Sequence, residues 1–343
     1  MTILLYVATL LLMGGLFLYR RLLSLPYLLA PLVIAILFHV GYSELAISDT
    51  EMLTNFCKGV SYQEDYFETV VTTDTKGKTH TKFVYHGPEY YVTDVHGHNT
   101  SVDRDNYERI ARKFGCEPSH KSMTGKVHVY IWDQSDKRAE IIVSNHRYRN
   151  PTLLNNHVFK FDAVTKEEIE QYGLYERPKI TNFIHCRSVM GWRGEYDESL
   201  DFFNARYGKD FQLRVLLLFF HGLPVESAVW QENLWRGGKK NELVLCVGLD
   251  DANNVSWTRA FSWTEVESIK ANFTTALPFS EPFQMSRLMA WLESDVKPTW
   301  RRKEFADFSY ITFDLPGWLV FLSLAIEVVV LVLCVVYEES RRR

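Results

Sequence analysis

Three long apolar runs constrain this chain more than any other feature of its sequence. Met1–Tyr19 and Leu22–Ser43 carry no charged residue, and Leu315–Tyr337 carries one, Glu327. At a helical rise of 1.5 Å per residue, each run comes close to or exceeds the roughly 30 Å thickness of a bilayer core. We predict transmembrane helices at about 2–19, 24–43 and 315–337. The first two form a hairpin over 1–43, and a basic tail follows at 338–343.

The arginines beside these runs predict an orientation. Arg20 and Arg21 separate the first two runs, and Arg341, Arg342 and Arg343 follow the third. The positive-inside rule places both groups in the cytoplasm, so the middle of the chain is expected on the outer side. A cleavable signal peptide would carry its positive charge before the apolar core, whereas here the charge comes after it.

The average composition conceals this division. The chain has 343 residues, a formal net charge of −4 and 47% hydrophobic residues. Without the apolar runs and their arginines, the middle segment is mildly acidic and of ordinary globular composition. A polyanion-binding protein needs a basic surplus on its binding face, so nucleic acid is not an expected partner.

Cysteine spacing excludes the common zinc and thioredoxin-type patterns. Cys57, Cys116, Cys186 and Cys246 lie in the middle segment, with no CxxC pair among them. In an oxidising compartment they could form up to two disulfides. Cys57–Cys116 is the expected pair because both residues flank one compact N-terminal unit, and separate thiols are the alternative.

The first half of the middle segment is rich in short β-strand patterns. Between Tyr62 and His146 such stretches recur and are bounded by turn signals, and a helical pattern at Val102–Phe114 interrupts them. We predict a β-rich α+β subdomain over 44–150, followed by a connecting segment at 151–194.

The second half has the pattern of an α/β domain. Phe211–Phe220 and Leu243–Leu249 are continuous apolar runs, too short to cross a membrane and typical of strands buried on both faces. Helical patterns alternate with them, at Glu195–Tyr207, Val225–Trp235 and Thr264–Phe273. A three-layer α/β subdomain over 195–314 is therefore expected.

This second half also resembles a known family. Tyr207–Trp263, and above all LWRGGKKNELVL at 234–245, is similar to the TPM domain of thylakoid and membrane-associated proteins, with the likeness covering about 195–275. The resemblance implies a membrane-tethered domain on the outer side, acting in assembly or repair or as an acid phosphatase. Asp250 and Asp251 are the catalytic candidates that such a metal-dependent hydrolase would use. Two Asp in an Asp-Asn stretch are also ordinary turn formers.

A second resemblance concerns the β-rich half. The stretches FETVVTTD and VYHGPEYYV are similar to uncharacterised membrane proteins of tailed phages and bacteria. This likeness implies a bacterial inner membrane, with the middle domain in the periplasm.

One short motif has the spacing of a metal site. Asp94, His96 and His98 occupy alternate positions, which in a strand project to one side. His80 or His86 could supply a further ligand to a divalent metal. The glycine between the two histidines of the motif favours a turn instead, and in that case no cofactor is expected.

Glu327 is the one carboxylate inside an apolar run. A charge at mid-membrane costs about 2.5–3.5 kcal/mol on insertion scales, so this group should be protonated, paired or turned toward other helices. His39 in the second run is the candidate partner. We expect Glu327 to serve helix association, in preference to an ion pathway.

No catalytic motif of the GxSxG, HExxH or GxxxxGK[ST] type is present. The sequence therefore predicts a non-catalytic integral membrane protein, with the lipid bilayer as one partner. Its outer domain is expected to assemble with other envelope proteins or with further copies of itself. The alternative is the TPM-like, metal-dependent phosphatase.

Overall fold

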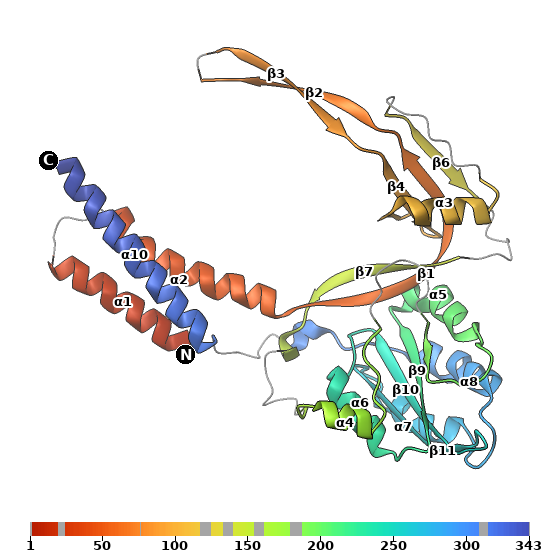
Figure 1. Cartoon of the computed structure of the whole chain (residues 1–343). Helices are drawn as coiled ribbons and strands as arrows, with labels where there is room; N and C mark the ends of the chain where they lie inside the picture. Colours follow the sequence, from red (N-terminus) through yellow and green to blue (C-terminus); the bar gives the residue numbers. More distant parts are fainter. Residues whose placement is uncertain are drawn as a thin grey trace. The chain divides into compact units, whose positions relative to one another are not determined.

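The chain forms two compact units. The computed structural model describes residues 2–19, 25–75, 77–116, 125–132, 140–153, 161–178, 187–308 and 315–342. The helical unit comprises Met1–Asp49, Arg147–Lys160 and Glu304–Arg343, and the mixed unit comprises Thr50–His146 and Phe161–Lys303 (Figure 1). The predicted α+β and α/β subdomains thus belong largely to one unit.

Three apolar helices build the helical unit. They are α1 (Thr2–Tyr19), α2 (Leu25–Ala46) and α10 (Gly317–Arg342), and each contacts the other two. Their core consists of small and aliphatic side chains, namely Leu5, Ala35, Leu315, Leu319 and Val320. Within the described residues, two helical segments are long and apolar enough to cross a membrane, Leu29–Ala46 and Gly317–Tyr337. Two short 3₁₀ turns, η1 (Pro151–Leu153) and η3 (Phe305–Phe308), complete the described part of this unit.

An antiparallel sheet with one helix forms the first half of the mixed unit. Its strands are β1 (Ser48–Gln63), β4 (Glu89–Asp94), β5 (Asn99–Val102), β6 (Val127–Ile131) and β7 (Ile141–Arg149). The order is β5-β4-β1-β6, and β7 also pairs with β1. Helix α3 (Arg104–Lys113) begins at the cap Asp103 and buries Tyr107 and Ile110 against Val60 and Tyr62. The prediction of a sheet carrying one helix is confirmed.

Strands β1 and β4 continue beyond this sheet as a two-stranded ribbon. The ribbon consists of β2 (Tyr66–Thr73) and β3 (Thr79–His86) and extends away from the sheet (Figure 1). The pairing register continues without a shift from Gly59↔Thr93 in the sheet to Thr73↔Thr79 in the ribbon. The two segments are therefore parts of one long hairpin.

A four-stranded sheet forms the second half. Its strands are β8 (Val189–Met190), β9 (Arg214–His221), β10 (Glu242–Leu249) and β11 (Val255–Ser262), in the order β11-β10-β9-β8. Strands β8, β9 and β10 run parallel, and β11 pairs antiparallel with β10.

Helices cover both faces of this sheet. One face packs on α5 (Ser199–Phe211), α7 (Glu267–Ala276), α8 (Met285–Trp291) and the π-helical turn η2 (Leu292–Val296), and the other on α4 (Lys166–Gln171) and α6 (Glu226–Trp235). The short helix α9 (Lys297–Thr299) follows η2. In β9, Leu217 belongs to the first core and Leu218 to the second, and both are fully buried. The predicted two-sided burial is confirmed, and the segment expected to be a connection contributes α4 and β8.

Several predicted boundaries in this half are wrong by a few residues. The helix expected to stop at Gly208 is α5, which continues to Phe211 and ends at Gln212 in the left-handed region (φ 49°). A Cβ on Gly208 would lie 2.9 Å from Thr54 Oγ1 of β1. The glycine thus permits close approach of the helix to β1, and the following strand begins later than predicted.

Candidate functional site

The β2–β3 ribbon has one face without charge. Directly paired residues of antiparallel strands share a face. One face therefore carries the pairs Phe67–Tyr85, Thr69–Phe83, Val71–Thr81 and Thr73–Thr79. We call these eight residues the uncharged face. The opposite face carries ionisable side chains, namely Glu68, His80, Lys82 and His86.

The uncharged face is exposed. Phe67, Val71, Phe83 and Tyr85 are 55%, 60%, 68% and 51% exposed, and all four threonines of the face are exposed as well. The rings of Phe67 and Tyr85 lie against each other, with centroids 5.2 Å apart. Contiguous exposed apolar surface of this kind marks interaction sites in soluble proteins.

Strand β6 adds apolar side chains on the same side of the hairpin. It pairs with β1 so that Val127, Val129 and Ile131 lie opposite Gln63, Ser61 and Gly59. Alternation along the continuous strand places these positions on the side of Phe67. The three β6 side chains are 57–62% exposed. Outside the helical unit, most of the strongly exposed large apolar side chains of the described residues therefore lie on this side.

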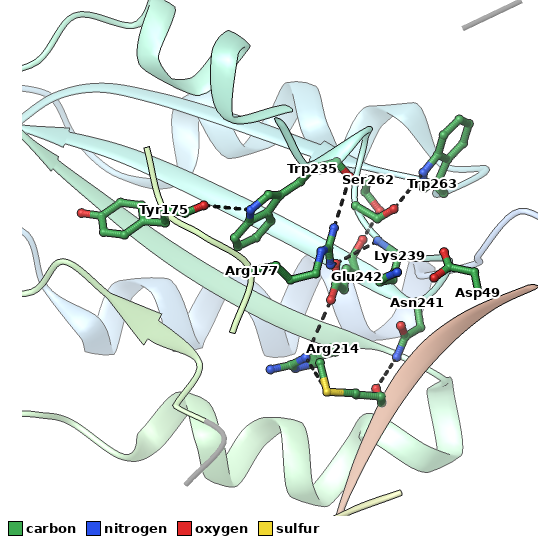
Figure 2. Close-up of polar contacts among 12 residues, drawn as sticks. Asp49, Tyr175, Arg177, Arg214, Trp235, Lys239, Asn241, Glu242, Ser262 and Trp263 are labelled. Atoms are coloured by element: carbon green, nitrogen blue, oxygen red, sulfur yellow. Dashed lines mark hydrogen bonds and ion pairs between the residues drawn. The ribbon is translucent and has the colours of Figure 1, made fainter. Parts of the chain in front are cut away.

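A buried ionic cluster lies at the starts of the two central strands (Figure 2). Arg214 opens β9 and is fully buried, and Glu242 opens β10 and is 1% exposed. Arg177 donates to Glu242 Oε2 at 2.5 Å and Arg214 Nη1 lies 3.7 Å from Oε1. The Lys239 amide also donates to Oε2, at 2.8 Å.

These contacts pair the charges within the chain, while Glu242 Oε1 and Arg214 Nε are buried without a hydrogen bond to a described residue. Burial raises the pKa of the Glu242 carboxyl, but the charges of Arg177 and Arg214 outweigh it and hold that pKa below its usual range. Arg177 also donates to the Trp235 carbonyl at 3.1 Å and lies over its ring. Asn241 donates to the Met52 carbonyl at 2.6 Å and so joins β1 to β10. The cluster is a structural connection between distant segments, and the sequence analysis did not identify it.

The predicted catalytic pair lies in a turn. Asp250 accepts from the backbone amides of Ala252 and Asn254 at 2.9 and 2.8 Å, and from Asn254 Nδ2 at 3.0 Å. These bonds, that of the Asn254 side chain first, lower the pKa of the Asp250 carboxyl. Asp251 follows on the exposed side of the same turn. Asp250 therefore closes the β10–β11 connection, and the structure brings no metal-binding carboxylate to it among the described residues.

The predicted metal motif is occupied by an ammonium group. Lys209 Nζ donates to Asp94 Oδ2 and lies 2.9 Å from His98 Nδ1, while His96 Nε2 lies 3.2 Å from Asp210 Oδ1. Burial raises the pKa of the Asp94 carboxyl, but the Lys209 ammonium outweighs it and the pKa is lowered. Within the described residues no group of three or more His, Cys, Asp and Glu could hold a metal ion. The metal prediction is therefore wrong for these residues, because the sequence did not show that Lys209 reaches them.

Glu327 contacts a different partner from the one predicted. Its carboxyl is fully buried, with Thr9 Oγ1 of α1 at 2.9 Å and Ser323 Oγ of its own helix at 3.0 Å. His39 lies 2.7 Å from the Tyr6 hydroxyl instead. Glu327 thus joins α10 to α1 within one chain, and the expected pairing with His39 is wrong.

The remaining predicted residues divide into two groups. Cys57 and Cys116 both belong to the core under α3, but they are free thiols, and Cys57 Sγ donates to the Gly59 carbonyl at 3.3 Å. The predicted disulfide is therefore not formed in this structure. The other group lies outside the described residues or side chains, and comprises Cys186, Arg20, Arg21, Arg341, Arg342 and Arg343.

A groove of about 520 Å³ follows the edge strand β11 between α6 and α7. Its basic side chains are already paired, Arg259 with Glu232 at 3.0 Å and Lys270 with Glu267. The groove therefore offers no unbalanced charge to an ionic ligand.

No known protein family, curated protein or solved structure matches this chain.

Glu242→Gln tests the buried cluster. Removing one partner of a buried ion pair leaves uncompensated charge, so we expect a loss of about 3–5 kcal/mol in the free energy of unfolding at neutral pH. The folded pKa of Glu242 is below the ordinary 4.5. Its contribution is therefore complete above pH 4.5 and is lost as the pH falls through the folded pKa.

Denaturant unfolding of the detergent-solubilised protein at several pH values, followed by tryptophan fluorescence, measures this. The difference from the wild type should shrink in acid. Glu232→Gln is the matched control, because its pair with Arg259 is partly exposed and should contribute at most about 1 kcal/mol. Equal losses in both variants would contradict the structural role of the cluster.

Glu327→Leu tests the link between α1 and α10. The Thr9 hydroxyl lies 2.9 Å from both Glu327 Oε2 and the Leu5 carbonyl, and its one hydrogen can serve only one of them. Glutamine, like a protonated glutamate, can donate to Thr9 and accept from Ser323. We expect Glu327→Gln to keep the thermal stability in detergent and Glu327→Leu to lose about 1 kcal/mol. The outward-facing Val328→Leu is the control, and an unchanged Glu327→Leu variant would show that the contact contributes nothing.

Proposed function

We propose that this protein is an integral membrane protein whose mixed unit assembles with other proteins of the envelope through the uncharged face of the β2–β3 ribbon. The observation that carries the proposal is that face itself. Four large apolar side chains, each more than half exposed, lie on it, and none of its eight residues is charged; the Asp65 carboxylate accepts from the Tyr85 hydroxyl at the base. A surface of this composition binds apolar partners, and its hydroxyl groups have no histidine or lysine of the same face beside them to activate them.

The outer surface of the helical unit supports a membrane anchor. Large apolar side chains point outward from all three helices, among them Ile3 at 79%, Leu37 at 65% and Phe321 at 74% exposed. In water such a surface is unfavourable, whereas lipid acyl chains are its natural solvent. The polar groups Thr9, Ser323 and Glu327 face inward and contact one another, as expected of a bundle within a membrane.

The orientation follows from the arginines. If all three helices cross the membrane, the arginines between the first two helices and those of the C-terminal tail lie on the same side. The positive-inside rule then favours a cytoplasmic hairpin loop and tail. The mixed unit is then extracytoplasmic. The resemblance of the β-rich half to phage and bacterial membrane proteins favours the bacterial inner membrane and its periplasm as the setting.

Phe67→Lys with Phe83→Lys tests assembly through the face. Two lysines make the desolvation of this surface unfavourable, so the native mass of the complex should fall while membrane retention stays unchanged. The complex is first fixed on spheroplasts with a membrane-impermeant cross-linker and then sized in mild detergent. Cross-linking by such a reagent also requires the proposed outer location.

Lys82→Glu with His80→Glu is the matched control, because it changes charge on the opposite face of the same ribbon. Its complex should keep the wild-type mass. A wild-type protein that already has the mass of a single chain, or a double-lysine variant of unchanged mass, would contradict the proposal.

The resemblance to the TPM domain leaves a phosphatase as the alternative. We expect the full-length protein to hydrolyse no generic phosphate ester above the detergent blank, with or without divalent metal. Asp250→Asn is the informative variant, since asparagine keeps the two hydrogen bonds from the backbone amides to Oδ1 and removes the charge and the bond from Asn254 Nδ2. Metal-dependent turnover that disappears in Asp250→Asn would establish the phosphatase and refute the non-catalytic function.

A further inference from the structure

The β2–β3 ribbon is a small element, and no other described layer of the structure covers it. A two-stranded ribbon is marginally stable in water, and such elements normally pack one face on another layer. At about 3.3 Å per residue its eight-residue strands extend roughly 26 Å. Its uncharged face is exposed over this length, and no described segment covers it.

The side chains of this face are graded in size along the ribbon. The pair nearest the sheet is Phe67–Tyr85, and the next is Thr69–Phe83. Toward the tip follow Val71–Thr81 and Thr73–Thr79. Bulky rings therefore lie at the base and small β-branched side chains at the tip.

This gradient makes the face complementary to itself. When two such faces meet about a two-fold axis with their ribbons antiparallel, the aromatic base of one copy lies over the small tip of the other. Alternation of large and small side chains across facing layers is what lets them interdigitate. The two-fold axis then passes between the Thr69–Phe83 and Val71–Thr81 pairs, and the contact is isologous and closed.

Charge and area agree with a second copy as the occupant. None of the eight residues of the face is charged, and the nearby Asp65 carboxylate lies at the base, where it accepts from the Tyr85 hydroxyl at 2.9 Å. In the antiparallel arrangement the two bases, and with them the two Asp65 carboxylates, lie at opposite ends of the contact. The four large side chains are 51–68% exposed, and with about 150–250 Å² for each aromatic ring the contact between two copies is on the order of the 1,000 Å² expected of a specific interface. A ribbon that finds its covering layer in a second copy also removes the exposed apolar surface.

We propose that the uncharged face packs on the uncharged face of a second copy of this chain, so that two ribbons form a four-stranded sandwich about a two-fold axis. This inference rests on the proposed function, for which it names the partner. The charged faces, with Glu68 and Lys82, remain outside the sandwich and in water.

Single cysteines test the packing directly. Val71→Cys places a thiol on the uncharged face next to the proposed axis, and Val70→Cys places one on the opposite face. Both are made in a chain whose Cys116, Cys186 and Cys334 are serine. A bis-maleimide cross-linker applied to membranes should convert most of the Val71→Cys protein, but not the Val70→Cys protein, into a species of twice 40.1 kDa on a denaturing gel.

Co-purification of two differently tagged copies, expressed together, measures self-association without an engineered thiol. Wild-type copies should co-purify, and Phe83→Lys should reduce the recovery at least tenfold. Absence of both the cross-linked dimer and the co-purification overturns this inference. If the double-lysine variant nevertheless lowers the native mass, another protein occupies the face and the proposed function stands.

If the ribbon bound the lipid surface instead of a second copy, the experiments would give a different pair of results. Bromine-labelled lipid would quench a tryptophan introduced by Phe83→Trp, and the Val71→Cys dimer would be absent. That pair of results would refute the second copy as the occupant and, with an unchanged native mass, the proposed function as well.

Discussion

The burial of β9 and β10 on both faces is the constraint on which the mixed unit depends. Two adjacent parallel strands that are apolar at every interior position need a layer of helices on each side. Helices α5, α7 and α8 cover one face, and α4 and α6 cover the other. Because the strands leave no water-facing side, their first residues, Arg214 and Glu242, enter the interior as well. Their charges persist there only because Arg177 and the Lys239 amide complete the cluster.

That cluster also explains how distant segments meet. Arg177 belongs to the stretch before β8, and Met52 lies in β1, yet both contact the starts of the central strands. Replacing such an ionic cluster by apolar residues is often neutral for stability. The main contribution of the cluster is therefore to position these segments, because each buried charge requires a neighbour of opposite charge.

The sequence predicted the elements whose signal is local. Apolar length identified the helices, two-sided apolar runs identified β9 and β10, and turn residues bounded the hairpins. Partnerships across long separations were not predictable, because no local pattern shows that Lys209 reaches Asp94 or that Thr9 reaches Glu327. The role of Gly208 was not predictable for the same reason, because it depends on a close approach to Thr54, which is far away in the chain.

The ribbon lies between these two cases. Its strands were predictable, and the alternation of Phe67, Thr69 and Val71 with a glutamate-bearing face was visible in the sequence. The sequence did not show the register that places Phe83 and Tyr85 on the same side. It also did not show that no other described segment covers these side chains. An uninterrupted register from β1–β4 into β2–β3 is what turns two ordinary strands into a projecting element with one apolar face.

A membrane anchor changes what such a face can do. An interface near the lower limit of specific contacts is weak between molecules diffusing in three dimensions. Anchoring confines both molecules to one surface and restricts their orientations, which raises the effective concentration of one face toward the other. In the proposed membrane setting, the anchor and the modest, uncharged face are therefore complementary features. The anchor raises the effective concentration, and the face supplies the selectivity. A soluble unit with the same face and no anchor would tend to aggregate.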